Sequence, residues 1–253
     1  MEWDKEIEDI SKWIKNYIKN SGAKGCVIGI SGGIDSAVVS CLCVKALSIK
    51  NVLGIYMPCY SAPNMGIDAK LLSKNLNIKF LTVPITTIYN ETIDILNFNK
   101  NDKNYKITRA NLKARIRMVI LYSFANNLNY LVAGTGNKSE LDIGYFTKFG
   151  DGAVDFEPIG DYYKTEIYKM AKLMPEIPKS ILTKEPSADL WDGQTDEQEI
   201  GMSYKELDKI LQSIEKGNNK ELDKIDIEKL TRVQNMIRSS IHKNNIPPKY
   251  KRI

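Results

Sequence analysis

The sequence Ser31-Gly32-Gly33-Ile34-Asp35-Ser36 follows the apolar run 26–30 and precedes the apolar run 37–42. This order predicts a buried strand that turns through a glycine-rich loop into a helix. Two consecutive glycines let backbone N–H groups turn toward an anion, and the start of the helix adds the positive end of its dipole. The two serine hydroxyls are further donors. The stretch therefore predicts a phosphate-binding loop, and a plain tight turn before a helix is the structural alternative.

Asp35 is the acidic residue of this loop. A carboxylate among phosphate-binding groups repels the phosphate unless a cation lies between them. Mg²⁺ binds carboxylate and phosphate oxygens together, so its presence is the simplest explanation for Asp35. We therefore expect Asp35 to bind Mg²⁺.

The loop does not follow the two commonest nucleotide-binding patterns, because the chain has no GxxxxGK[ST] sequence and Gly29, Gly32 and Gly33 do not form GxGxxG. It resembles instead the SGGxDS pyrophosphate loop of ATP pyrophosphatases of the adenine-nucleotide hydrolase type. The resemblance implies that the loop binds the β and γ phosphates of ATP while ATP is cleaved at its α phosphate. The residues implied are Gly29, Ile30, Ser31, Gly32, Gly33, Ile34, Asp35 and Ser36.

The composition is that of a compact protein in a reducing compartment. The 253 residues are 43% apolar and 26% charged, enough for one α/β domain. The N-terminus has no basic leader with an apolar core, and no apolar run approaches the roughly 18 residues that cross a bilayer, so we expect neither secretion nor a membrane partner. The four cysteines show no CxxC spacing, which favours buried, reduced thiols and a cytoplasmic location.

The net charge of +5 is moderately basic and fits a polyanionic small molecule as well as a nucleic acid. The absence of CxxC and the short basic tail (Lys249, Lys251 and Arg252) disfavour an RNA-modifying enzyme, so we expect no nucleic-acid partner.

Apolar strand patterns alternate with helical patterns along the chain. The strands are predicted at 26–30, 52–57, 79–83 and 130–133, and the helices at 3–18, 36–47, 68–76, 85–96, 109–127, 161–174, 204–216 and 227–242. This order predicts an α/β fold with a doubly wound, mainly parallel sheet flanked by helices, and ligand loops at the carboxyl ends of its strands. No repeat or low-complexity linker divides the chain, so residues 1–253 are expected to form a single domain.

The helix predicted at 109–127 is apolar on more than one face. A helix on the surface of a globular protein needs only one apolar stripe, so this helix is expected to be covered on both sides. It is either a central helix of the core or part of a subunit interface.

A long segment, 134–161, follows the last predicted strand and begins at the same sheet edge as the phosphate loop. It is rich in glycine and charged residues, more than a connector needs. A solvated surface loop is the alternative, but the aromatic residues 145, 146 and 149 between the charges are expected to hold the segment against the body.

Four separated motifs carry a more specific resemblance. They are GTGNKSE at 134–140, FTKFGDG at 146–152, EPSADL at 185–190, and His-Lys at 242–243 followed by Pro-Pro at 247–248. Their residues and order resemble the ammonia-dependent NAD synthetases over nearly the whole chain. The resemblance implies an adenine-nucleotide alpha-hydrolase-like fold and a homodimer. It also implies amidation of deamido-NAD⁺: ATP adenylates the nicotinate carboxylate, pyrophosphate leaves, and ammonia then displaces AMP.

Site residues follow from the same resemblance, position by position. Asp35 and Glu140 would share Mg²⁺, and two carboxylates from loops at adjacent strand ends suit a hard cation that also takes phosphate oxygens. Thr135, Lys164 and Ser187 match positions that contact ATP. Lys164 would stabilise charge on the α phosphate and the leaving pyrophosphate, which makes it catalytic. An exposed helix lysine is the alternative for Lys164.

The resemblance assigns deamido-NAD⁺ binding to Arg115, Lys148, Asp155, His242 and Lys243. The cations would face the dinucleotide's pyrophosphate, and Asp155 would accept a hydrogen bond from a ribose hydroxyl or the base. An ordinary ion pair on its helix is the alternative for Arg115.

His242 is the only histidine, which excludes a histidine-rich zinc site, and no GxSxG nucleophile elbow is present. Catalysis is therefore expected to depend on positioning and electrostatics. Asp151 lies between Gly150 and Gly152, and we interpret it as a catalytic carboxylate that stabilises the ammonium as it arrives.

Some questions stay open at this point. No residue in 58–66 matches an adenine contact, and 191–198 has the composition of a loop that acts as a lid. The chain contains no nitrilase or amidotransferase domain, so free ammonia is the expected nitrogen source. Two other functions are considered: another pyrophosphate-loop ATP-using enzyme, tRNA-modifying or GMP-synthetase-like, and a regulatory module that binds ATP without turnover.

Overall fold

The computed structural model describes residues 2–187, 193 and 195–252. Its four strands form one parallel sheet in the order β3-β2-β1-β4. The strands are β1 (Cys26–Gly29), β2 (Val52–Tyr56), β3 (Lys79–Thr82) and β4 (Leu131–Ala133). Each lies within one residue of its predicted bounds, because β1, β2 and β4 are buried on both faces and so read as continuous apolar runs.

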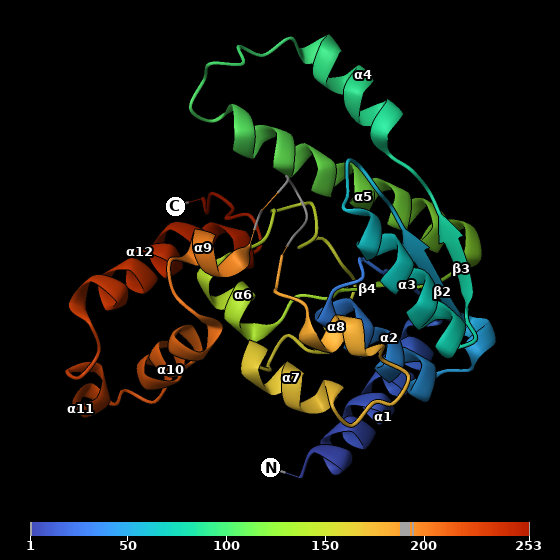
Figure 1. The fold of residues 1–253 in the computed structure, drawn as a ribbon, viewed down its shortest axis with the longest axis horizontal. Coiled ribbons are helices and arrows are strands. Elements are labelled where there is room, and N and C mark those ends of the chain that lie inside the picture. The colour runs from blue at the N-terminus through green and yellow to red at the C-terminus, as the bar shows by residue number, and fades with distance from the viewer. Residues whose placement is uncertain (1, 188–192, 194, 253) are drawn as a thin grey trace.

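Helices cover both faces of the sheet (Figure 1). One buried cluster joins the Cys26 and Ile28 side of the sheet to α1 (Trp3–Ser21), α2 (Ile34–Ala46), α3 (Pro63–Asn75) and α7 (Lys164–Ala171). A second cluster joins the Val27 side to α4 (Thr86–Leu96) and α5 (Tyr105–Leu128). The predicted doubly wound α/β fold is therefore confirmed.

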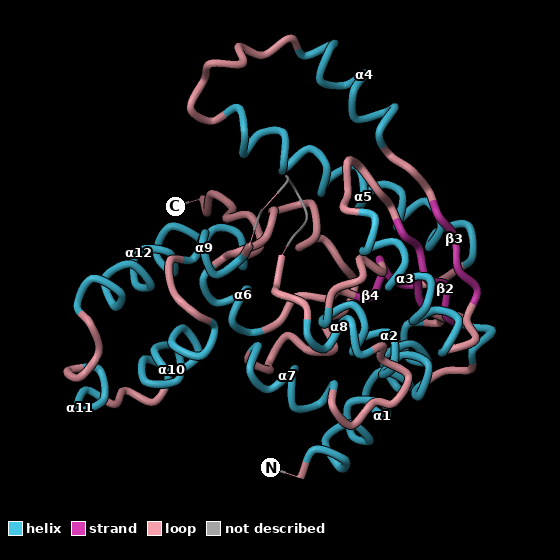
Figure 2. Tube along the Cα trace, in the orientation of Figure 1, coloured by secondary structure: helices cyan, strands magenta, loops and turns pink. Residues whose placement is uncertain are grey.

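The later helices α6 (Lys138–Ile143), α9 (Asp196–Ile200), α10 (Tyr204–Glu215), α11 (Asn219–Leu222) and α12 (Ile227–Asn244) lie beyond the β4 edge, and Figure 2 shows that this part of the molecule is helix and loop. A third apolar cluster joins α6, α10 and α12. The other short elements are η1 (Ile49–Asn51) and α8 (Lys179–Thr183). None of the described helices is both long and apolar enough to cross a membrane.

Several local predictions need correction. The helices predicted from 68 and from 109 begin earlier, at Pro63 and Tyr105. The helix predicted at 161–174 begins only at Lys164, because Tyr163 caps it in a box with Glu166. The segment 134–161 contains a helix, α6, which begins at an asparagine cap that the surrounding glycines obscured. Within that segment Phe149 is exposed, so it does not hold the loop against the body as expected.

The helix α5 is covered over most of its apolar residues. Ile116 is buried, and four further apolar side chains pack against the core: Leu112, Ile120, Leu121 and Phe124. Ile107 and Val119 are more than half exposed. The described chain thus covers this helix largely as a helix of its own core, and these two side chains are left exposed.

The phosphate loop joins β1 to α2 and lies against the first turn of α3. Gly32 adopts a left-handed φ of +84°, and a Cβ at this position would lie 2.5 Å from the carbonyl oxygen of Met65. Ser31 Oγ accepts the Gly33 N–H at 3.1 Å, and Ser36 Oγ donates to the Gly33 carbonyl at 2.9 Å. The glycine is therefore required both by its backbone conformation and by the close approach of α3.

Replacing Gly32 by Ala should cost about 3 kcal/mol of unfolding free energy, because left-handed strain and a backbone clash add together. Gly22→Ala is the matched control, since Gly22 has a similar φ of +74° but no atom within 4 Å of its Cβ position. We expect that control to cost only about 1 kcal/mol. Urea denaturation of both variants checks the difference, and equal losses would contradict the packing argument.

Candidate active site

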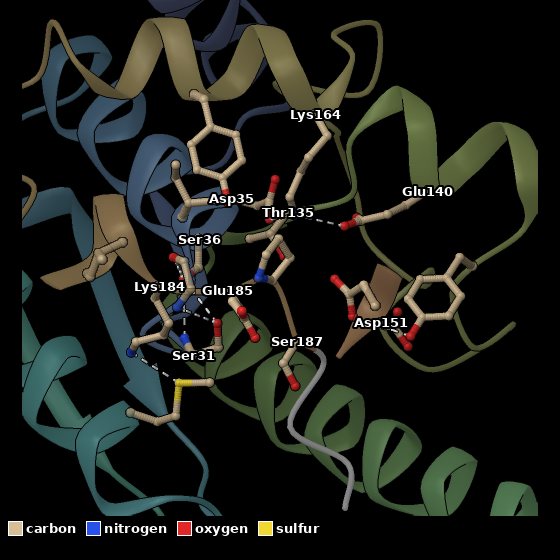
Figure 3. Close-up of a pocket in the computed structure, with 18 residues that line it drawn as sticks. Ser31, Asp35, Ser36, Thr135, Glu140, Asp151, Lys164, Lys184, Glu185 and Ser187 are labelled. Carbon is tan, nitrogen blue, oxygen red and sulfur yellow. Dashed lines mark hydrogen bonds and ion pairs between the residues drawn. The ribbon is translucent and has the colours of Figure 1, made fainter. Parts of the chain in front are cut away.

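Two adjoining hollows lie at the carboxyl edge of the sheet. The smaller, of about 140 Å³, lies over the phosphate loop (Figure 3). It is lined by the predicted residues Ser31, Gly33, Ile34, Asp35, Ser36, Thr135, Glu140, Asp151, Lys164 and Ser187. The structure thus brings together side chains that are up to 156 positions apart in the sequence, from Ser31 to Ser187.

The larger hollow has a volume of about 640 Å³ and extends toward α5 and α12. Its lining includes the predicted residues Gly29, Ile30, Arg115, Lys148, His242 and Lys243. Ser31, Thr135 and Asp151 line both hollows. A ligand in one hollow can therefore meet a ligand in the other at this boundary.

A buried ammonium group lies at the centre of the smaller hollow. Lys164 Nζ lies 2.5 Å from Asp35 Oδ2 and 3.2 Å from Glu140 Oε1, and the lysine is only 2% exposed. Burial alone would lower its pKa, but the charges of Asp35, Glu140 and Asp196 outweigh burial and raise the pKa. Lys164 is therefore a charged, buried side chain, and the alternative of an exposed helix lysine is wrong.

The carboxylates of Asp35, Glu140 and Asp196 surround Lys164, and one lysine cannot balance three negative charges. Burial raises the pKa of Glu140 to about 7; the charges of Asp35 and Asp196 add to the shift, and Lys164 opposes it. Tyr204 Oη donates to Glu140 Oε1 at 3.3 Å and to Asp196 Oδ2 at 3.1 Å. Burial likewise raises the pKa of Asp196. Three carboxylates around one ammonium favour a second cation.

Asp35 and Glu140 are suitable ligands for that cation, because an oxygen of each already lies close to the same ammonium nitrogen. Within the described ranges, no three histidine, cysteine, aspartate or glutamate side chains are placed to bind a metal ion together. A magnesium ion here would need phosphate oxygens to complete its shell, as Mg²⁺ commonly does in nucleotide sites. The donor set therefore fits a metal that arrives with a nucleotide.

Asn137 is a site residue that sequence reasoning missed. It is fully buried, its Nδ2 donates to Asp35 Oδ1 at 3.0 Å, and its Oδ1 accepts the Glu140 N–H at 3.1 Å. Its backbone N–H donates to Glu140 Oε2 at 3.4 Å, so Asn137 orients both carboxylates while it caps α6. An asparagine followed three residues later by glutamate is the sequence signal of such a cap, but this signal does not reveal the hydrogen bond to Asp35, which is 102 positions away.

Lys184 was also missed. It lines the smaller hollow, and its Nζ donates to the Gly32 carbonyl at 3.2 Å and to Asp68. The lysine links the phosphate loop to α3 and to the segment that carries Ser187. The pattern around it held no sign of this role, since Asp68 is 116 residues away.

The predicted cations of the larger hollow bind backbone carbonyls. Arg115 Nη2 donates to the Lys148 carbonyl at 3.3 Å, and Lys148 Nζ donates to the His242 carbonyl. Lys243 Nζ donates to the carbonyls of Gly144 and Phe146 at 2.6 and 2.8 Å. Arg115 forms no salt bridge with a carboxylate in the described part of the chain, so its alternative as an ordinary ion pair is not supported.

Asp155 lines neither hollow. Its Oδ2 accepts the Val132 N–H at 2.7 Å, and its Oδ1 accepts from Tyr122 Oη at 3.2 Å. The carboxylate thus takes up a backbone donor of the edge strand β4, a structural role that the sequence did not indicate. Its predicted contact with the dinucleotide stays a prediction.

The structure describes part of the two segments whose roles the sequence left open, 58–66 and 191–198. Ser61 of 58–66 lines the larger hollow beside Met57 and Ile55, which makes these residues candidates for the nucleotide contacts that the sequence left unassigned. Of the predicted lid 191–198, residues 191, 192 and 194 lie outside the described residues, and 196–198 form the start of α9. Residues 188–190 of the EPSADL motif also lie outside them.

These features define an ATP-using α/β enzyme of the pyrophosphate-loop class, in which a loop between β1 and α2 faces paired carboxylates and a lysine. The chain matches the family described as NAD synthase over residues 6–247. It belongs to that family, and the sequence-based resemblance is confirmed.

Named relatives agree. The chain is 46% identical over 250 residues to the NH(3)-dependent NAD(+) synthetase of Archaeoglobus fulgidus, covering 98% of this chain and 97% of that one. It is 43% identical to the enzyme of the same name from Carboxydothermus hydrogenoformans, covering 97% and 96%.

Solved structures agree as well. An NMN synthetase from Francisella tularensis superposes with a TM-score of 0.88 at 33% identity, covering 99% of each chain. An NH3-dependent NAD synthetase from Campylobacter jejuni, in complex with nitrate, superposes with a TM-score of 0.84 at 33% identity, covering 99% and 100%.

Glu157 lies behind the segment that carries Thr135. Its Oε2 is buried and has no hydrogen-bond partner among the described residues, and it would lie 2.4 Å from a Cβ at Gly134. Burial raises the pKa of this carboxyl to about 8, against a hydrogen bond from the Gly136 N–H that lowers it. We therefore expect Glu157 to be mostly protonated at neutral pH.

The folded state binds the proton of Glu157 more tightly than the unfolded state does. The contribution of Glu157 to the free energy of unfolding should therefore be highest below about pH 4.5 and should fall as the pH rises toward 8. Glu157→Gln removes the titration. Relative to the wild type, the variant should gain on the order of 2 to 4 kcal/mol of unfolding free energy between pH 5 and pH 9. Denaturant unfolding at the two pH values measures this gain, and a difference that does not change with pH would contradict the assignment.

Proposed function

We propose that this protein amidates deamido-NAD⁺ with ammonia at the expense of ATP. The products are NAD⁺, AMP and pyrophosphate, and the intermediate is an adenylated nicotinate carboxylate. The observation that carries the proposal is the boundary shared by the two hollows, because adenylation requires the α phosphate and the nicotinate carboxylate to meet. The names of the relatives support the same reaction.

In the smaller hollow, ATP would place its β and γ phosphates on residues 29–36, with Thr135 and Ser187 as further contacts. Asp35 and Glu140 would hold Mg²⁺, which would supply positive charge to the phosphate oxygens when bound. Lys164 carries a buried positive charge at this place and would stabilise the negative charge that develops on the leaving pyrophosphate. The backbone N–H groups of the loop and the start of α2 would act in the same direction.

In the larger hollow, the cations Arg115, Lys148 and Lys243, together with His242, would face the pyrophosphate of deamido-NAD⁺. Asp155 would have to reach the dinucleotide outside the hollows. We also propose a cytoplasmic location, which the four free, buried thiols support.

A mass-spectrometric assay with ATP, Mg²⁺, ammonium and deamido-NAD⁺ tests the proposal. AMP and NAD⁺ should appear together in equal amounts. A parallel reaction with nicotinate mononucleotide tests the smaller acceptor that the name of the Francisella tularensis NMN synthetase suggests. AMP formation only with the mononucleotide, or only with tRNA, would overturn the proposed substrate, and ATP binding without turnover would favour the regulatory module.

Asp35→Ala and Glu140→Ala should each lower kcat at least 100-fold at any Mg²⁺ concentration, because each removes a metal ligand. Circular dichroism should show an intact fold, since both carboxylates lie at the edge of the sheet rather than in its core. Asp161→Asn is the control, because its carboxylate pairs with Lys138 outside both hollows. Wild-type rates in either alanine variant would remove the metal assignment.

Asp151 is proposed to stabilise the incoming ammonium. It lines both hollows, and its Oδ1 accepts the Thr147 N–H at 3.0 Å. Asp151→Asn keeps an oxygen for that hydrogen bond and removes the charge. We expect KM for ammonium to rise about tenfold while KM for ATP changes less than twofold, as steady-state kinetics would measure. Equal changes in both constants would count against the role.

A homodimer is proposed from the apolar surface of α4 and α5. Helix α4, the connecting segment and the start of α5 project from the body (Figure 1), and six apolar side chains of the two helices and this segment are exposed: Ile88, Ile95, Leu96, Phe98, Ile107 and Val119. A second copy that packs on this surface would cover these exposed side chains.

Light scattering should give the mass of a dimer for the wild type. Ile95→Glu should shift it toward the monomer, because Ile95 is 82% exposed in a single chain and a buried charge would oppose association. Ile227→Glu, on exposed α12, should leave the dimer intact. A monomeric wild type would refute the proposal.

A further inference from the structure

A buried carboxylate from α10 reaches the start of the helix that carries Lys164. Asp208 is 2% exposed, and its Oδ2 accepts the Thr165 N–H at 2.9 Å. Its Oδ1 accepts the hydroxyl of Ser139 at 2.5 Å. Asp208 lines neither hollow, so it does not contact a ligand bound in them.

Ser139 extends the connection to Lys164 itself. It is fully buried, and its Oγ accepts the Lys164 N–H at 2.9 Å while it donates to Asp208. The first N–H groups of a helix have no partner within the helix. Two of them, at Lys164 and Thr165, are therefore bound by side chains of two other helices, Ser139 of α6 and Asp208 of α10.

The same contacts fix the position of Glu140, because Ser139 precedes it in the first turn of α6. Asp208 thus binds Ser139 of α6 and Thr165 of α7, the sequence neighbours of Glu140 and Lys164, whose side chains meet 3.2 Å apart. A long lysine side chain has many rotamers, so its ammonium is placed accurately only if the backbone from which it extends is held in position.

We propose that Asp208 is a positioning residue that acts through Ser139 and the start of α7 to hold Lys164 in place for the phosphates of ATP. This inference rests on the proposed use of the smaller hollow for ATP. An aspartate suits the role because both of its oxygens accept hydrogen bonds, whereas an asparagine has only one acceptor. Its charge is also favourable at a helix N-terminus.

The start of α7 has a second cap that does not involve Lys164. Glu166 Oε2 accepts the Tyr163 N–H at 3.0 Å, which closes a capping box within the helix. The helix is therefore expected to form without Asp208. Glu166→Gln is the matched control, because it weakens a cap of the same helix but touches neither Ser139 nor Lys164.

The test compares the affinities of Asp208→Asn for ATP with Mg²⁺ and for adenosine, by competition with a fluorescent ATP analogue. Adenosine lacks the phosphates that Lys164 would contact. We expect the variant to bind ATP about 5- to 30-fold more weakly and adenosine within twofold of the wild type. Glu166→Gln should change both by less than twofold. Equal weakening for ATP and adenosine, or no change for ATP, would overturn the proposal.

A double-mutant cycle gives a second measurement. In a Lys164→Met background, Asp208→Asn should weaken ATP binding less than twofold further, because the side chain through which it acts is gone. A full additional loss would refute the role. Both experiments measure ATP binding and not NAD⁺ formation. A wild type that binds ATP but forms no NAD⁺ would overturn the proposed amidation. The role of Asp208 in positioning Lys164 could still be measured in that case.

Discussion

The buried ion cluster of Lys164, Asp35 and Glu140 is the interaction on which the site depends. Two carboxylates this close together repel each other unless a cation lies between them, and the repulsion grows as water is excluded. Lys164 supplies that cation in the protein itself, with its nitrogen 2.5 and 3.2 Å from the two oxygens. The cluster therefore presents positive and negative groups together, as is suitable for binding a phosphate chain and its metal.

The topology of the sheet explains why these residues meet. β1 and β4 are parallel neighbours, with Cys26 opposite Leu131, so their carboxyl ends lie side by side. Asp35 follows one end and Glu140 the other, and Asn137 joins them by hydrogen bonds to both residues. The helix that carries Lys164 packs on α2 and reaches the same edge, while α10 holds its first turn. The packing of the sheet and its helices thus brings the charges of Asp35, Glu140 and Lys164 together at one edge of the sheet.

The strands and the phosphate loop could be predicted because each is marked by residues that are close together in the sequence. A strand buried on both faces is a continuous apolar run, and Gly32 marks a left-handed turn beside it. The residues that were missed depend on partners far along the chain. Asn137 and Asp35 are 102 positions apart, and Ser139 and Asp208 are 69 apart. No periodicity links such pairs, so their hydrogen bonds cannot be read before the fold is known.

The sequence alone determined the class of fold, the loop for phosphate and the family, because residue type and order suffice for strand patterns, glycine turns and motifs. The tertiary structure decided which charges act together. It placed Lys164 in the interior rather than on the surface of a helix, and it turned Asp155 toward a strand edge instead of a hollow. The reason is physical: the effect of a charge depends on its distance from other charges and on the exclusion of water, and both arise only when distant segments pack.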